Sequence, residues 1–175
     1  MISIRNRIAI PNMIALRKVS RFLKRCPYRG AGVLFVCDDP DEGPMVLLGR
    51  RRYRWERNRW AIPGGGKKTR ETFEECAQRE ADQEFGRLHP EPKFVREVRQ
   101  RVPGIFEWST FIARLPSRPD RKLWPVPECY HSEFYEVGWF PLKRLPHGTS
   151  RLLTLWTLPQ CGFARDLIEQ EKSRC

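Results

Sequence analysis

The fold is decided by residues 60–88, which read WAIPGGGKKTRETFEECAQREADQEFGRL. A short apolar segment is followed by three consecutive glycines and then by a stretch crowded with acids. Thr72 and Glu75 have the spacing of a capping box, in which each side chain accepts from the backbone N–H of the other residue. Gly86 stands where a left-handed residue commonly ends a helix. The stretch therefore predicts a glycine-rich loop that leads into a helix.

Two rows of side chains lie along this predicted helix. The first is an apolar row at four-residue intervals, and its members are Phe73, Ala77, Ala81 and Phe85. Beside it, Glu80 and Glu84 are also four residues apart, so both carboxylates project from one face. Like charges at this spacing cost about 0.2–0.5 kcal/mol, and the helix dipole disfavours anions near its C-terminus. A divalent cation that prefers oxygen ligands, such as Mg²⁺, would offset both costs.

The same stretch resembles the Nudix box, G-x5-E-x7-R-E-U-x-E-E-x-G-U, in which U is a bulky apolar residue. The matching positions are Gly65, Glu71, Arg79, Glu80, Glu84 and Gly86. Three positions depart from the pattern: Gln83 replaces the first glutamate of the E-E pair, Ala81 is small, and Arg87 replaces the final apolar residue. The resemblance implies an α/β Nudix fold, an α/β/α sandwich with a mixed sheet between helices.

The resemblance also implies an activity, the Mg²⁺- or Mn²⁺-dependent hydrolysis of a phosphoanhydride bond in a nucleoside diphosphate linked to another moiety. It implies that Glu80 and Glu84 bind the metal together with the carbonyl of Gly65. A pair between Arg79 and Glu71 would then fix the loop against the helix. We therefore expect a pyrophosphatase with a nucleotide-type small-molecule substrate.

Gln83 is the departure with the largest expected consequence. Its side chain keeps a ligand oxygen at the metal but lacks the negative charge of the family's glutamate. A site that normally holds several ions should then hold fewer of them, or hold them more weakly. The alternative function is a catalytically weak Nudix module that binds or senses a nucleotide or RNA.

In this family a later acid often completes the metal site or acts as the base. Residues 133–145 (EFYEVGWFPLKRL) resemble the late Nudix strand, which is followed by a short helix. The nearby acids are Glu128, Glu133 and Glu136. Among these we select Glu133 as the candidate metal ligand.

An arginine-rich segment, residues 49–60, leads directly into the box. Arginine binds phosphate in a bidentate manner, and the interleaved aromatic rings can stack on bases. We take Arg52, Arg54 and Arg59 as candidate ligands of the substrate phosphates. A solvated loop whose charges keep the protein in solution explains the segment equally well.

Residues 28–175 are expected to form the Nudix domain. The expected strands cover residues 28–37, 45–48, 92–102 and 106–115, with a turn at 38–44 and a hairpin across 103–104. One broken helix or two short helices at 150–172 would close the second face of the sheet.

Residues 1–27 form a basic extension in which we expect an amphipathic helix after Asn12. Its basic face would suit RNA or a membrane surface, and an acid-free stretch is also typical of organelle presequences. Its apolar face would suit packing on the domain or on a second subunit, as in a homodimer. We favour packing, because so regular an apolar face usually packs.

The composition is that of a globular protein. The chain has 175 residues, of which 40% are hydrophobic, and its net charge of +12 favours polyanionic partners. Its six cysteines include no C-x-x-C pair, so we expect reduced thiols and a cytoplasmic protein. No apolar run approaches the roughly 18–20 residues of a membrane span, so we expect no transmembrane segment.

Overall fold

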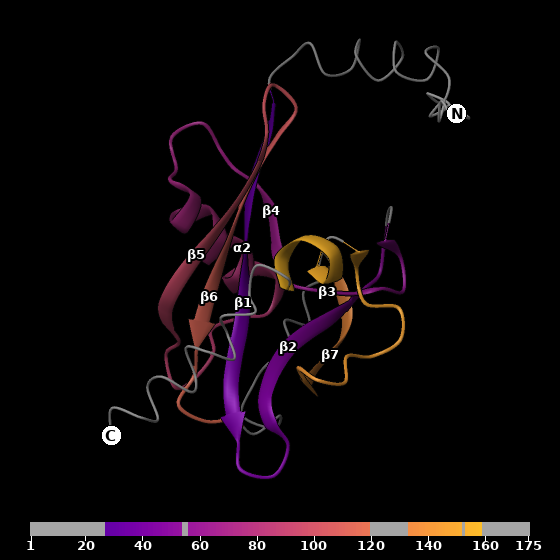
Figure 1. Ribbon diagram of the computed structural model, residues 1–175. Coiled ribbons are helices and arrows are strands. Elements are labelled where there is room, and N and C mark those ends of the chain that lie inside the picture. Colours follow the sequence, from indigo (N-terminus) through magenta and orange to yellow (C-terminus); the bar gives the residue numbers. More distant parts are fainter. Residues whose placement is uncertain (1–26, 54–55, 120–132, 152, 159–175) are drawn as a thin grey trace, which may run out of the picture.

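The computed structural model describes residues 27–53, 56–119, 133–151 and 153–158. Figure 1 shows a twisted sheet with helix α2 against one face and a short helical segment, η3, over the other. The elements in chain order are β1 (Tyr28–Asp39), β2 (Gly43–Arg51), β3 (Trp60–Ala61), β4 (Gly64–Gly66), α2 (Phe73–Glu84), β5 (Lys93–Val102), β6 (Phe106–Arg114), β7 (Phe134–Pro141) and η3 (Leu153–Thr157).

The seven strands form one mixed sheet centred on β1. The order is β3-β2-β1-β6-β5, with β4 also paired to β1 and β7 also paired to β2. Only the β1–β6 pairing is parallel among the described strands, and it runs from Tyr28↔Phe106 to Val36↔Arg114. On the other edge of β1, the first half pairs with β4 and the second half pairs with β2. The sheet therefore forks along β1.

Helix α2 has the caps that the sequence predicts. The Thr72 side chain accepts from the Glu75 N–H at 3.1 Å, and the Glu75 carboxylate accepts from the Thr72 N–H at 2.6 Å. Gly86 has a positive φ of 77°, the left-handed conformation that glycine adopts without a steric penalty. The predicted apolar row faces the sheet, where Ala77, Ala81 and Phe85 are buried.

Two apolar clusters lie on opposite faces of the sheet, because successive side chains of a strand point to opposite sides. In β1, Val33 and Phe35 pack beneath α2, whereas Leu34 and Val36 belong to the cluster that contains Leu153 of η3. An α/β domain with a mixed sheet covered on both faces is thus confirmed.

The strand and hairpin predictions are largely confirmed, with two corrections. The glycines of β4 form a short strand rather than a loop, because their extended backbones pair with Gly30, Ala31 and Gly32 of β1. The segment after β7 is a turn, closed by a bond from the Arg144 N–H to the Pro141 carbonyl, rather than the short helix of the family pattern.

Strand β2 is longer than the sequence indicates. The apolar run ends at Leu48, but pairing continues to Arg51 through β3 and β7. Arg50 and Arg51 are therefore strand residues with fixed directions. The predicted N-terminal helix and the part of the C-terminal helical region beyond residue 158 lie outside the described residues, so the boundary between residues 27 and 28 stays a prediction.

Within the described part of the chain, no helix has the length and apolar character needed to span a membrane. The RNA contact, the homodimer and the cytoplasmic location remain predictions.

Gly49 of β2 tests the packing beneath α2. A Cβ at this position would lie 2.7 Å from Cγ of Phe134 and 2.8 Å from Cε1 of Phe85. We expect Gly49→Ala to lower the free energy of unfolding by about 1–3 kcal/mol, the usual cost of overpacking a core, measured by chemical denaturation. Gly138→Ala on the neighbouring strand is the matched control, because its Cβ would meet Phe140 at an ordinary 3.4 Å. Equal effects of the two substitutions would contradict the tight packing at Gly49.

Candidate active site

Arg79 joins the parts of the box. Its guanidinium makes two bonds to the Glu71 carboxylate, at 2.8 and 3.0 Å, and one to the Gly66 carbonyl at 3.1 Å. It also donates to Glu80 Oε1 at 2.7 Å. The bond to Arg79 lowers the pKa of Glu71 to about 2, so this carboxylate is charged at any physiological pH. The predicted orienting pair is thus present as a bidentate ion pair.

The Glu80 carboxylate lies directly against the backbone of Gly65. A Cβ built on Gly65 would fall 2.5 Å from Glu80 Oε1 and 2.7 Å from Oε2. Only glycine leaves room for a carboxylate at that distance. The two residues come from β4 and α2, so the site depends on how closely the helix approaches this strand.

Glu84 is the buried acid of the site, with 6% of its surface exposed. Its Oε2 accepts from the Gly64 N–H at 2.8 Å. The pKa of Glu84 is raised to about 8, chiefly by burial; the negative charges of Glu133 and Glu80 also raise it, while the Gly64 bond and Arg51 lower it. A cation beside these three acids would favour the charged form of Glu84.

The three candidate late acids have different surroundings. Glu133 forms an ion pair with Arg51, and its charge acts on Glu84. Glu136 instead pairs with Arg50, 3.4 Å away, whose guanidinium also lies near the rings of Trp60 and Tyr135. Glu128 lies outside the described residues. This geometry favours Glu133 over Glu136 as a partner of the box acids.

Gln83 is exposed, and its amide oxygen accepts from Arg79 Nη1 at 3.3 Å. The side chain that replaces the family's glutamate is therefore tied to the same guanidinium as Glu71 and Glu80. Its role at a metal stays a prediction.

From the arginine-rich segment, the described residue that pairs with a candidate acid of the site is Arg51, which sequence analysis did not single out. Arg51 pairs with Glu133 and lines a pocket beside Gly64. Arg52 is exposed beside Tyr53, Arg59 is not among the residues that line this pocket, and Arg54 lies outside the described residues. The period of two along β2 was the available signal, because Arg51 follows Leu47 and Gly49, which both face α2.

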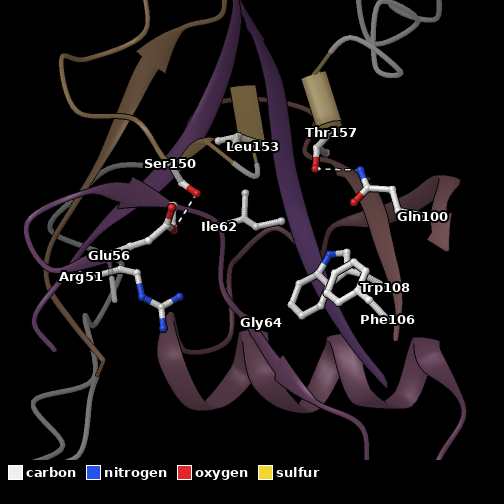
Figure 2. Close-up of a pocket in the computed structure, with 11 residues that line it drawn as sticks. Arg51, Glu56, Ile62, Gly64, Gln100, Phe106, Trp108, Ser150, Leu153 and Thr157 are labelled. Carbon is white, nitrogen blue, oxygen red and sulfur yellow. Dashed lines mark hydrogen bonds between the residues drawn. The ribbon is translucent and has the colours of Figure 1, made fainter. Parts of the chain in front are cut away.

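Figure 2 shows this pocket, with Arg51 at one end and the rings of Phe106 and Trp108 at the other. Its volume is about 70 Å³. Eleven residues line it: Arg51, Glu56, Ala61, Ile62, Gly64, Gln100, Phe106, Trp108, Ser150, Leu153 and Thr157. The N–H of Gly64 bonds to Glu84, so the pocket directly adjoins the acids of the box.

The donor set suits a hard cation in part. Among the described residues, no three side chains of His, Cys, Asp or Glu form a ready-made metal cluster. Glu80 lies against Gly65 and Glu84 bonds to the Gly64 N–H, so both supply carboxylate oxygens beside β4. The Gly65 residue pairs with Ala31 of β1, and its carbonyl also receives a weak 3.7 Å contact from the Cys76 thiol. Oxygen donors of this kind fit Mg²⁺ or Mn²⁺.

The sequence matches the family model described as NUDIX domain over residues 27–157. The match covers well over half of the chain, so the protein belongs to the NUDIX family. The box residues described above are thus those of a NUDIX domain.

Solved structures of this family share the fold. The MutT/nudix family protein from Enterococcus faecalis has a TM-score of 0.51 at 20% identity, with 77% of this chain and 53% of that chain covered. The MutT NUDIX hydrolase from Burkholderia pseudomallei has a TM-score of 0.50 at 22% identity, with 71% and 91% covered. The NUDIX domain of Shewanella oneidensis NrtR, solved with ADP ribose, has a TM-score of 0.51 at 16% identity, with 68% and 75% covered. Identities this low establish the fold alone.

The buried Glu84 carboxyl predicts a pH-dependent cost to stability. Its pKa rises from 4.5 to about 8 on folding, so the folded state retains a proton that the unfolded chain has already lost. Stability should therefore fall as pH rises from about 4.5 to 8. In EDTA, we expect Glu84→Gln to melt at a higher temperature than the wild type at pH 8.

This difference should shrink towards pH 4.5, where the wild-type carboxyl is neutral like the amide. The exposed Glu74 on the first turn of the same helix provides the control substitution, Glu74→Gln. A melting-temperature difference that does not change with pH would disprove the burial of a protonated Glu84.

Proposed function

We propose that this protein is a divalent-metal-dependent hydrolase that cleaves a phosphoanhydride bond in a nucleoside diphosphate linked to another moiety. The observation that carries the proposal is the contact of the Glu80 carboxylate with Gly65, next to the buried acid Glu84. Family membership supports the reaction class. Burying Glu84 near Glu133 and Glu80 disfavours its charged form, and binding of a nucleotide without catalysis does not require this cost.

Glu80, Glu84 and the Gly65 carbonyl would hold Mg²⁺ or Mn²⁺, and Glu133 would complete the site. The bound ion would neutralise phosphate oxygens and lower the pKa of a water nucleophile. Glu133 is paired with Arg51, so it becomes available to the metal when Arg51 turns to a phosphate. Arg51 would thus leave the Glu133 carboxylate and bind a substrate phosphate instead.

The remaining residues of the box position these groups. Arg79 holds Glu80 through one arm of its guanidinium and Glu71 through the other, which fixes the carboxylate against β4. The capping box at Thr72 fixes the start of α2. Arg52, Arg54 and Arg59 remain candidates for phosphate binding further from the acids.

A substrate panel tests the proposed activity. The purified full chain is incubated with Mg²⁺ or Mn²⁺ and with ADP-ribose, dinucleoside polyphosphates, NADH, CoA, nucleotide sugars, oxidised nucleotides or capped RNA, and the products are identified. The proposal expects at least one member to be split between two phosphates. Tight binding of one member with no hydrolysis of any would replace the enzyme with the alternative, a module that senses a nucleotide or RNA.

Removal of one charge from Glu80 tests its position in the site. We expect Glu80→Gln to lower kcat by at least about 100-fold, because a charged metal ligand becomes a neutral one while the shape is kept. Turnover of the best panel substrate at saturating Mg²⁺ measures the effect. Glu74→Gln, on the exposed first turn of α2, should leave kcat unchanged. An unaffected rate in Glu80→Gln would remove Glu80 from the site.

Restoring the family's glutamate at position 83 tests whether the neutral Gln83 weakens metal binding or turnover. We expect Gln83→Glu to increase the apparent affinity for Mg²⁺ or Mn²⁺, the turnover, or both, because the new carboxylate adds a negative charge beside Arg79 and Glu80. Titration calorimetry and metal-dependent rates measure the two effects. If neither quantity changes, Gln83 has no influence on the metal.

A further inference from the structure

We propose that the pocket between β6 and η3 binds the nucleobase of the substrate, with Trp108 as the stacking surface and Gln100 as the polar contact. This inference rests on the proposed function, because it assigns one end of the same substrate. The residues that carry it come from β5 and β6, outside the box.

Trp108 lies flat on the sheet over a surface made of glycines. A Cβ added to Gly30, Gly32 or Gly64 would approach atoms of its six-membered ring to 2.7, 3.0 and 3.1 Å, respectively. Its Nε1 donates to Thr110 Oγ1 at 3.0 Å, which fixes the rotation of the ring. The three glycines thus let the indole rest on β1 and β4, with its opposite face turned towards the pocket.

The neighbouring rings share this orientation. Phe106 and Trp108 are parallel within 5°, with centroids 6.4 Å apart, and Tyr28 is parallel to both within 11°. Figure 2 shows the two β6 rings side by side on one wall of the pocket. A flat, rigid aromatic wall stacks well on a base, because every nucleobase has a π face.

Gln100 supplies hydrogen-bonding capacity beside the rings. It pairs directly with Trp108 across the β5–β6 hairpin, and its amide nitrogen donates to Thr157 Oγ1 at 3.4 Å. Gln100 is buried, with only 6% of its surface exposed, and it borders the pocket. The second amide hydrogen and the carbonyl oxygen make no other hydrogen bond within the described residues, and an amide can bond a base edge through both.

The position of the pocket fits the proposed chemistry. Gly64 lies between the pocket and Glu84, and Arg51 lies at the end away from the rings. A Cβ added to Gly66 would lie 3.9 Å from Cε2 of Tyr28, so the row of rings borders β4, the strand that Glu80 and Glu84 contact. A base on Trp108 would direct its phosphates towards Arg51.

The size of the pocket supports a single ring system. A volume of about 70 Å³ has room for roughly five to seven water molecules at about 10–15 Å³ each. A complete nucleotide exceeds this space, so its sugar and phosphates would extend past Arg51 towards the carboxylates of the box. Arg51, which lies beside Glu56 at one end, and the rings at the other end thus offer partners for the phosphate and for the base.

Equilibrium binding in EDTA tests the assignment without requiring hydrolysis. AMP and ribose 5-phosphate, which differ by the base, are titrated into the wild type and into Trp108→Leu. We expect the substitution to weaken AMP binding by roughly 5- to 150-fold, the loss that corresponds to about 1–3 kcal/mol of stacking. Ribose 5-phosphate binding should not change. Trp139→Leu is the matched control, because Trp139 packs on the α2 face of the sheet, and it should alter neither affinity.

Tryptophan fluorescence provides a second test, which applies even if the Trp108→Leu variant fails to fold. AMP should quench tryptophan fluorescence in the wild type and in Trp139→Phe, and the quenching should be lost in Trp108→Phe. In Gln100→Leu, the affinities for AMP, GMP, CMP and UMP should converge. Unchanged AMP binding in folded Trp108→Leu, or equal weakening of AMP and ribose 5-phosphate, would overturn the proposal even if the wild type hydrolyses a panel substrate.

Discussion

The guanidinium of Arg79 bonds to three separate parts of the domain, namely Glu71 before the helix, Glu80 on the helix and the Gly66 carbonyl on β4. A planar group with donors in fixed directions can hold these parts in only one relative arrangement. Because Arg79 is largely buried against its partners, loss of the cation would leave two carboxylates facing each other without compensation. The placement of Glu80 against Gly65 depends on this one side chain.

A second requirement of the structure is that side chains approach the backbone closely on both faces of the sheet, and glycines make this possible. Gly65 admits the Glu80 carboxylate, and Gly30, Gly32 and Gly64 admit the Trp108 ring. None of these four glycines has a positive φ, so the absent side chain rather than an unusual backbone angle explains the residue. One short strand, β4, thereby brings an acidic helix and an aromatic wall to within one peptide of each other.

The sequence was most informative where local chemistry determines local structure. Thr72, Glu75 and Gly86 mark the ends of α2 through local chemistry, and the resemblance to the Nudix box implied the Arg79–Glu71 pair that the structure contains. Arg51 was missed because the apolar run of β2 ends at Leu48, and only pairing with β3 and β7 extends the strand. The wall made by Trp108 was missed because it needs glycines from two distant strands. The charge of Glu133 raises the pKa of Glu84, whereas Glu136 pairs with Arg50; the choice of Glu133 as a metal ligand stays a prediction.

The parallel pairing of β1 with β6 has a consequence for how the chain folds. The β1–β2 and β5–β6 hairpins join near neighbours in sequence, but the Arg29–Glu107 pair that accompanies the β1–β6 pairing spans 78 residues. Closing so long a loop costs more conformational entropy than closing a hairpin, and contacts of this kind slow folding. Arg51 belongs to the first hairpin and Trp108 to the second, with α2 between them in the chain. A fragment that contains either hairpin alone holds only part of the pocket, so the binding surface arises with the cooperative assembly of the whole sheet.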